Sequence, residues 1–540
     1  MQLVAYGAQD VYLTGNPQIT FWKVTYRRHT NFAMESIEQT FNGQADFGRR
    51  VQCTISRNGD LAYRTYLQVT LPEIGQANCC GSTNTDSTYA RWLDYPGEQL
   101  ISMVEVEIGG QRIDRQYGDW MHIWNQLTLT AEQERGYNKM VGQTTQLTYL
   151  TDPSYAAVDS ACATGAPSAV CAPRNALAET TLYVPLQFWF CRNPGLALPL
   201  IALQYHEVRI NLELRPSDEV LFAVTNLNKA IKAGQNVKDT VSYQKSLVAA
   251  SLYVDYVFLD TDERRRMAQN PHEYLIEQLQ FTGDESVGSS SNKIKLNFNH
   301  PCKELVFVVQ PDANVDYCSS FINGQNLNMA LGAQAFNYTD SLDALLSHMG
   351  AFSGRDQVAA TTNAFIGTNG LFQDPGADDL GNATAGNQWG DASIGSASSP
   401  FPISDRGDSG VSDAGAFVLA ECAMSKHCWG QNPVVTAKLQ LNGQDRFSER
   451  EGTYFDLVQP YQHHTRSPDT GINVYSFALR PEEHQPSGTC NMSRIDNATL
   501  QLVLSTNAIG GDATAKVRVY ATNYNVLRVM SGMGGLAYSN

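Results

Sequence analysis

Short runs of alternating apolar and polar residues recur along most of this chain, with turn residues between them. Residues 32–41 alternate loosely and stop at Asn42-Gly43, a pair typical of tight hairpin turns. Residues 61–71 alternate after another turn at Arg57-Asn58-Gly59-Asp60. Further strands are expected at residues 51–55, 100–108, 182–190 and 207–214. Many short strands between turns predict an all-β protein.

The second half of the chain has the same character. Strands are expected at residues 252–259, 274–281, 293–298, 305–310 and 499–504. Helical patterns are few and short. Aromatic residues between 116 and 135 recur at helical spacing, and Asp260 to Met267 places acidic residues before arginines, as a short capped helix does.

Part of the pattern occurs twice. Ile108-Gly109-Gly110-Gln111 ends a strand in the first half, and Leu441-Asn442-Gly443-Gln444 does so in the second. A Phe-rich segment that ends in proline follows each of them, at residues 188–194 and 477–481, and a closing strand comes after it. Repeated turns and strands in the same order predict two copies of one β module. Such a duplication favours a building block over a catalyst.

The repeat divides the chain into parts. We expect an N-terminal arm at residues 1–30, a first module at 31–216, a connector at 217–248 and a second module at 249–540. The second module contains a stretch at about 311–433 that is rich in small polar residues. Because a surface loop can lengthen at small free-energy cost, we interpret this stretch as an insertion displayed outward.

Composition and charge exclude several classes of protein. The 540 residues carry a net charge of −16, and a basic face of the kind that binds nucleic acid is not indicated. The eleven cysteines have no CxxC spacing and are expected to be free thiols. No signal peptide is recognised, and no apolar run is long enough for a membrane-spanning helix.

Candidate chemistry is sparse. His463-His464 and His484 could suggest a metal site, but we interpret them as loop residues, and we assign Glu482-Glu483 to a turn or an interface. We therefore expect no catalytic residues, no metal and no cofactor. Trp120 and Trp189 lie in regular segments and are expected in the core.

Five segments carry a resemblance to a known family. They are residues 2–21 (QLVAYGAQDVYLTGNPQITF), 26–32 (YRRHTNF), 56–61 (SRNGDL), 271–278 (PHEYLIEQ) and 480–491 (RPEEHQPSGTCN). In this order they resemble the major capsid proteins of nucleocytoplasmic large DNA viruses, closest to the algal and protist members.

The resemblance implies two consecutive eight-stranded antiparallel jelly rolls with long loop insertions and a few short helices. It also implies a structural virion protein without enzymatic activity. Homotrimers would form pseudo-hexagonal capsomers that tile an icosahedral shell around an internal membrane and a DNA genome. The chain would be assembled in the host cytoplasm and would lie in the outer capsid shell of the virion.

Partners follow from the same resemblance: neighbouring capsomers, minor capsid and penton proteins, the inner membrane through minor proteins, and host surfaces or fibres at the outer loops. Sequence-specific contact with nucleic acid is not expected. The arm is expected to contact minor proteins on the inner face through Tyr6, Tyr12, Phe21, Trp22, Arg27 and Arg28.

Two further expectations concern sugars. Asn337 and Asn382 stand in glycosylation sequons within the insertion and are the expected sites of sugar attachment. The alternative function is a carbohydrate-binding, lectin-like jelly roll, because that architecture also occurs in lectins.

Overall fold

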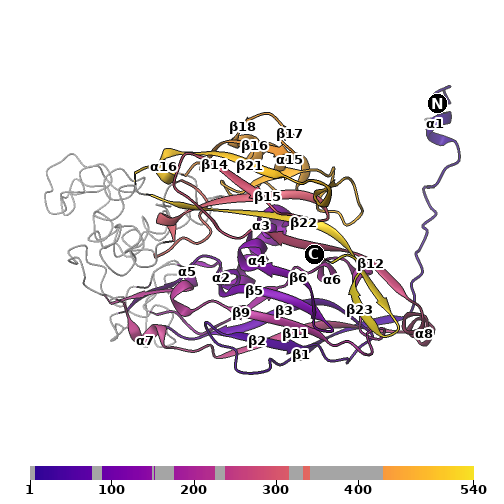
Figure 1. Ribbon diagram of the computed structural model, residues 1–540. Helices are drawn as coiled ribbons and strands as arrows, with labels where there is room; N and C mark the ends of the chain where they lie inside the picture. Colours follow the sequence, from indigo (N-terminus) through magenta and orange to yellow (C-terminus); the bar gives the residue numbers. More distant parts are fainter. Residues whose placement is uncertain are drawn as a thin grey trace, which may run out of the picture.

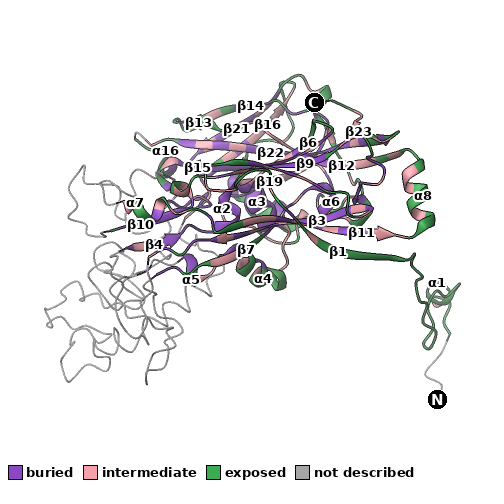
Figure 2. Ribbon diagram, turned by 90° about the horizontal axis from the view of Figure 1, so that it is seen from below, coloured by how far each residue is buried: buried purple, intermediate pink, exposed green. Residues whose placement is uncertain are grey.

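A computed structural model describes residues 6–75, 88–148, 151, 176–225, 238–315, 332–340, 430–511 and 513–539. Figure 1 shows two β modules stacked on each other, with the N-terminal arm projecting from one end. The same two modules account for nearly all the buried strand residues, whereas the arm is exposed (Figure 2).

The first module pairs a five-stranded antiparallel sheet, in which the short strand β8 (Leu198–Pro199) lies off the main order, with a four-stranded one. One has the order β1 (Phe32–Gln39), β11 (Ala249–Leu259), β3 (Leu61–Leu71) and β7 (Thr180–Pro185). The other has the order β2 (Arg50–Thr54), β9 (Val208–Leu214), β5 (Ile101–Ile108) and β6 (Gln111–Tyr117). The eight main strands form a jelly roll, because each sheet places strands from the beginning and the end of the module side by side.

The second module repeats this order strand for strand. One sheet runs β12 (His272–Phe281), β22 (Ala515–Met530), β15 (Pro301–Pro311) and β19 (Asn473–Ser476). The other runs β14 (Ser291–Leu296), β21 (Ala498–Leu504), β16 (Val434–Leu441) and β17 (Gln444–Asp445). The predicted duplication and the double jelly roll are therefore confirmed.

Shorter elements surround the sheets. The strands are β4 (Tyr89–Trp92), β8 (Leu198–Pro199), β10 (Leu221–Val224), β13 (Glu285–Val287), β18 (Arg450–Glu451), β20 (Cys490–Asn491) and β23 (Met533–Leu536). The helices are α1 (Val11–Thr14), α2 (Pro96–Leu100), α3 (Gly118–Thr128), α4 (Ala131–Val141), α5 (Thr145–Thr148), α6 (Trp189–Arg192), α7 (Thr240–Tyr243), α8 (Thr261–Gln269), α15 (Gln459–His463) and α16 (Thr506–Ile509). Single turns are η1 (Pro194–Leu196), η2 (Ser217–Glu219), η3 (Asp312–Asn314), η6 (Met492–Arg494) and the π-helical η5 (Tyr454–Val458).

The two repeated turns have the same backbone geometry. Gly109 and Gly110 connect β5 to β6 with φ values of +59° and +84°. Asn442 and Gly443 connect β16 to β17 with φ values of +52° and +78°. Positive φ at both central residues is what a two-residue hairpin of the I′ type requires, and glycine and asparagine accept it most readily.

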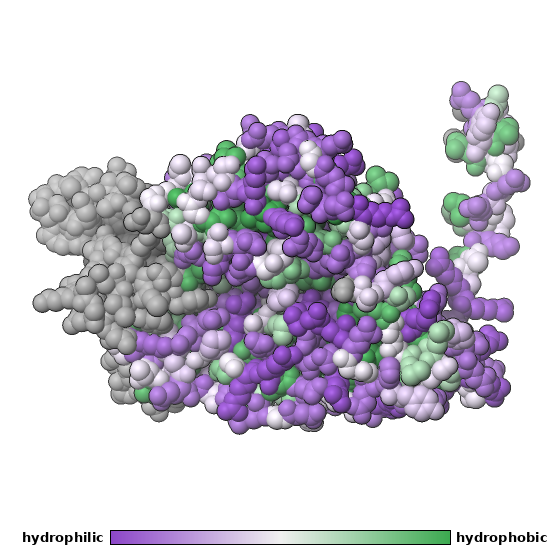
Figure 3. All heavy atoms as spheres, viewed as in Figure 1, coloured by the Kyte–Doolittle hydropathy of each residue, from purple (hydrophilic) through white to green (hydrophobic). Residues whose placement is uncertain are grey.

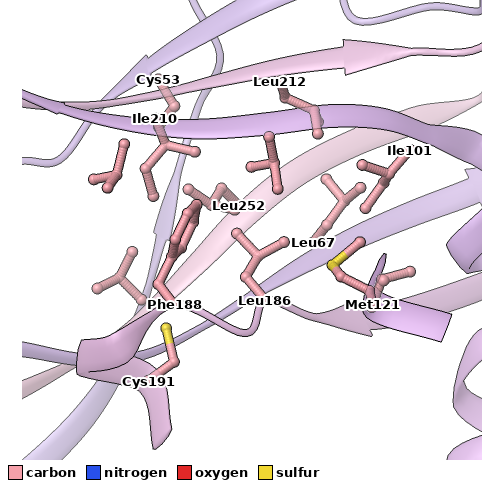
Figure 4. Close-up of a cluster of buried hydrophobic side chains, with 14 of the residues drawn as sticks. Cys53, Leu67, Ile101, Met121, Leu186, Phe188, Cys191, Ile210, Leu212 and Leu252 are labelled. Atoms are coloured by element: carbon pink, nitrogen blue, oxygen red, sulfur yellow. The ribbon is translucent and has the colours of Figure 1, made fainter. Parts of the chain in front are cut away.

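Each module has its own apolar core between its two sheets. In the first module, Phe188, Ile210 and Leu252 point into the space between the sheets (Figure 4). In the second, Phe307 and Leu500 lie in the equivalent layer, and β21 alternates buried and half-buried residues along its length. Successive side chains of a strand point to opposite faces of its sheet, so every second residue points into the core.

Several expectations hold in detail. Helix α3 and the first five residues of α4 fall in the region 116–135, where helical spacing was expected. Helix α8 is capped by Asp260, whose carboxylate accepts a hydrogen bond from the backbone N–H of Thr261. Trp120 and Trp189 are buried. The four described cysteines, Cys53, Cys191, Cys302 and Cys490, are free thiols as expected.

The expected module boundaries need correction. Strand β11, placed at the start of the second module, pairs with β1 and β3 in the first. The expected connector is also not a simple linker, because its strand β10 is buried and pairs with β4. An alternating pattern identifies a strand and its two faces, but the strand that it pairs with is decided by the rest of the fold.

The expected insertion is also partly wrong. Residues 332–340, which lie within the stretch predicted to face outward, are buried for the most part. Phe336 and Tyr338 pack in a cluster between the two modules. Residues 316–331 and 341–429 lie outside the described part of the chain.

Candidate functional site

The N-terminal arm is the most exposed apolar segment that the structure describes. Residues 6–31 are exposed almost throughout, and helix α1 has no buried residue. Tyr12 is 91% exposed, Phe21 101% and Trp22 83%. Figure 3 shows hydrophobic residues among hydrophilic ones in the outer part of this projecting segment. Because exposed aromatic groups gain free energy when they are buried, the arm has the character of a segment that lies on a partner surface.

The structure keeps the predicted arm residues on one segment but does not bring them into one cluster. Tyr6, Arg27 and Arg28 are exposed like the aromatic residues between them. The arm leaves the body at Phe32, which is paired with Leu259 immediately before α8. The first module's sheet therefore fixes the point at which the arm begins, whereas the side chains of the arm stay exposed.

A second feature is the interface between the modules. Helix α3 belongs to the first module and packs on the outer face of the second module's sheet β12-β22-β15-β19. Trp120 lies 5.4 Å from the ring of Tyr520, and Trp124 lies in the same cluster. Tyr117 and Phe281 meet edge to face, with ring centroids 5.0 Å apart. The interface is thus built like a domain core.

Charged side chains join the modules beside this cluster. The carboxylate of Asp119 lies 3.0 Å from Arg215 of the first module and 3.2 Å from Arg518 of the second. Burial alone would raise the pKa of Asp119, but the two guanidinium groups outweigh it and lower that pKa. Asp119 is therefore an ionised group that links both modules.

Glu277 makes a similar connection from the second module. Its carboxylate lies 2.9 Å from Lys303 and 3.3 Å from Arg192 of the first module. His484 is also 3.3 Å away. Burial works to raise the pKa of Glu277, yet the hydrogen bond from His484 and the charges of Lys303 and Arg192 lower it to about 2. Sequence reasoning missed this cluster because its members lie far apart along the chain.

His464 is buried between two carboxylates. Its Nε2 atom lies 2.9 Å from Glu304 and its Nδ1 atom lies 2.8 Å from Glu482. Burial would lower the pKa of His464, but the two carboxylates raise it to about 9. The interpretation of His464 as a plain loop residue was incomplete, whereas Glu482 lies in a turn, one of the two roles assigned to it. The described residues contain no group of three or more potential ligands arranged to hold a metal ion.

One expected sugar site is corrected by the structure. Asn337 is 1% exposed, and its Nδ2 atom donates a hydrogen bond to Gln334 at 2.7 Å. Its Oδ1 atom accepts from the hydroxyl of Thr339 at 2.6 Å. The prediction that Asn337 carries sugar is therefore wrong for the folded chain, because its side-chain amide is buried and already hydrogen-bonded. Asn382 lies outside the described residues.

Cys53 and Cys191 do not form a reactive site. Burial raises the pKa of Cys53 and of Cys191 to about 11, so both thiols stay protonated near neutral pH. Over the residues described, no helix has the length and apolar character needed to cross a membrane.

Comparison with known proteins agrees with this architecture. Residues 20–260 match the family model described as major capsid protein N-terminus. Residues 263–535 match the model described as large eukaryotic DNA virus major capsid protein. The junction between the two matches falls after β11, where the structure also ends the first module.

Individual relatives match over the full chain. The major capsid protein of Phaeocystis pouchetii virus is 73% identical over 540 residues, covering 100% of this chain and 99% of the relative. The major capsid protein of Chrysochromulina ericina virus is 70% identical with the same coverage. Among solved structures, a chain of the PBCV-1 virus capsid is 33% identical with a TM-score of 0.60, covering 96% of this chain and 100% of that one.

We predict that Asp119→Ala lowers the free energy of unfolding by about 3 kcal/mol, because it leaves two partly buried arginines without their shared carboxylate. Urea denaturation followed by tryptophan fluorescence measures the change. Glu207→Ala is the matched control, since Glu207 and its partner Arg209 are 59% and 43% exposed and an exposed pair contributes less than about 1 kcal/mol. Equal losses in the two variants would contradict the proposed link.

We also predict that His464 makes stability depend on alkaline pH. Its pKa is about 9 in the folded chain and 6.5 is the ordinary value, so its contribution is complete below about pH 6.5 and is lost as the pH rises through 9. The loss is roughly 3 kcal/mol. Urea denaturation between pH 6 and 10 should show this extra slope in the parent chain and in His463→Gln, but not in His464→Gln. A slope that persists in His464→Gln would reject the assignment.

Proposed function

The chain belongs to the family of large eukaryotic DNA virus major capsid proteins, and on this premise we propose that three copies of it form a pseudo-hexagonal capsomer. In this proposal the capsomers tile an icosahedral shell around an internal membrane and the DNA genome. The chain is then a structural component of the virion shell with no catalytic role, as its family is structural.

The observation that carries the proposal is the repeated strand order of the two modules. A cyclic trimer of such chains presents six similar jelly rolls around its axis. An object with three-fold symmetry and six similar sides can occupy lattice positions that have six neighbours. The duplication therefore supports the role of a capsomer in a closed shell. A chain with a single jelly roll would need six copies to form a unit with six similar sides.

The arm supports a second part of the proposal. We assign Tyr6, Tyr12, Phe21 and Trp22 to contacts with minor capsid proteins on the inner side of the shell, with Arg27 and Arg28 beside them. All these side chains are exposed in the single chain, so partners can bury them without disturbing either core. The inner membrane would be contacted through those minor proteins, and penton proteins would fill the five-fold positions.

The remaining assignments concern the outside of the shell and the place of assembly. Outer loops of the capsomer would meet host surfaces or fibres, and Asn382 remains the proposed position for sugar. Assembly would take place in the host cytoplasm, which agrees with the free thiols among the described cysteines.

The first test is the mass of the purified chain by light scattering, with negative-stain images of the same sample. We expect three times the chain mass of 59.4 kDa and particles with a hexagonal outline. A monomer at all concentrations would contradict the capsomer and would direct attention to carbohydrate binding, which a glycan array measures.

A second prediction concerns the arm. Deleting residues 1–25 should leave the trimer mass and the melting temperature unchanged, because the described arm residues contact neither core. Binding to shells or to shell fragments that contain minor proteins should weaken, and a co-sedimentation assay measures it. The double variant Phe21→Ser/Trp22→Ser tests the aromatic pair alone. An unfolded deletion variant would show that the arm is part of the core.

A further inference from the structure

Two cysteines of the second module face each other across neighbouring strands. Strand β20 pairs with the beginning of β15, where Cys490 stands directly opposite Cys302 and Asn491 opposite Pro301. Cys302 is buried in the second module's core, and Cys490 is half-buried and packs against the same core. Directly opposed residues of an antiparallel pair have their side chains on the same face of the sheet. The two thiols therefore lie side by side at the margin of one core.

The backbone spacing of this pair fits a disulfide. Opposed Cα atoms in an antiparallel pair are about 4.5–5.5 Å apart, and a disulfide joins residues whose Cα atoms are about 4.4–6.8 Å apart. The Sγ atom of Cys302 now lies 3.6 Å from the carbonyl oxygen of His300 and 3.7 Å from that of Asn299. A thiol is a weak donor, so these contacts are lost at little cost when the side chain turns toward Cys490.

The other two described cysteines are placed differently. Figure 4 shows Cys53 and Cys191 on opposite sides of the first module's core. The Sγ atom of Cys191 lies 3.2 Å from the hydroxyl of Thr65. Of the four cysteines that the structure describes, Cys302 and Cys490 are thus the two that occupy opposed positions on paired strands.

We propose that Cys302 and Cys490 form a thiol oxidation site, at which a small disulfide such as oxidised glutathione produces a cross-strand disulfide. The thiolate of Cys490, the more exposed of the two, attacks one sulfur of the reagent, whose disulfide bond breaks and releases one thiol. The thiolate of Cys302 then attacks the Sγ atom of Cys490 and displaces the second thiol. The two cysteines are oxidised, the reagent is reduced to two thiols, and these carry away the two protons.

The environment of the pair makes this exchange slow. Burial and the neighbouring Cys490 raise the pKa of Cys302 to about 12. Burial also raises the pKa of Cys490, although the charge of Arg446 works against it. Because the thiolate is the reacting form, both cysteines stay reduced while the chain is in a reducing compartment. The disulfide then forms during longer exposure to an oxidising medium, such as the one outside a cell.

The disulfide would fasten a loop that takes part in the module interface. Strand β19 ends at Ser476, and the chain returns to β15 at Cys490. In the loop between them, the carbonyl of Pro481 accepts a hydrogen bond from Lys303 at 2.7 Å, and His484 lies 3.3 Å from Glu277. A covalent bond at Cys490 fixes the end of this loop. It also closes a long stretch of chain, which restricts the unfolded state and stabilises the folded one.

The test is made on the folded parent chain. The chain is incubated with oxidised glutathione, unfolded in excess iodoacetamide to block the remaining thiols, and digested with trypsin. Cys302 is the single cysteine of the tryptic peptide 296–303, and Cys490 is the single cysteine of the peptide 467–494. We expect mass spectrometry to find these two peptides linked in most molecules and separate after treatment with dithiothreitol. The rate of linkage should rise about tenfold between pH 7 and pH 8, as the thiolate fraction does.

A stability measurement adds a matched control. Oxidation should raise the urea midpoint of the parent chain and of Cys191→Ala, because Cys191 lies in the other module's core. The same treatment should leave the midpoint of Cys490→Ser unchanged. Comparing oxidised with reduced protein within each variant removes the effect of the substitution itself. A rise that persists in Cys490→Ser would show that other cysteines cause it, and would overturn the stabilising role.

Two results would overturn the site itself. One is alkylation of both cysteines after the incubation. The other is glutathione retained on Cys490 with Cys302 alkylated, because the buried thiol then does not reach its neighbour. If Cys490→Ser does not fold, the peptide linkage in the parent chain still decides. The site lies within one module and does not depend on the capsomer. A monomer that forms the disulfide would contradict the proposed function alone, and a trimer that does not form it would contradict this inference alone.

Discussion

The packing of α3 against the outer face of the second module's sheet is the contact on which the rest of the molecule depends. A β-sheet has two faces, and a jelly roll core covers only one of them. The outer face of β12-β22-β15-β19 carries Val306, Val308 and Tyr520, which would cost free energy if water covered them. Helix α3 buries them and thereby makes two modules into one body.

The ion pairs at this interface have a different role from the apolar cluster. Taking charges out of water is costly, so Asp119 between its two arginines adds less net stability than its short distances suggest. Such pairs do penalise any shifted arrangement in which a charge loses its partner. The apolar residues therefore hold the modules together, and Asp119 and Glu277 fix how they are placed.

Duplication gives each module the same strand order and a helical segment at the same place in it. In each module this segment comes after the repeated hairpin, β5–β6 in the first and β16–β17 in the second. Helix α3 joins the two modules, whereas the η5–α15 segment packs on its own module through Phe455 and β19. At the buried contact α3 uses tryptophan and isoleucine, whereas the exposed side of the η5–α15 segment carries Leu457, Val458 and Tyr461. That difference is what solubility of a free subunit would require.

The sequence by itself determined the local structure and the family. The turns at Gly109-Gly110 and Asn442-Gly443, the alternating strands, the helix at 118–128 and the exposed arm all follow from short-range chemistry, and the five family segments identify the double jelly roll. Those features depend on residues close together in the chain, and for that reason they could be predicted.

Only the tertiary structure decided which strands and side chains meet. The sequence placed β11 in the wrong module, because its alternation is the same whichever sheet accepts it. It placed Asn337 on the surface, because a polar stretch does not reveal that it passes between two modules. The carboxylates around His464 could not be foreseen either, since Glu304 reaches it from a distant strand. Burial and pairing are properties of the folded chain, set by contacts between residues that the sequence keeps far apart.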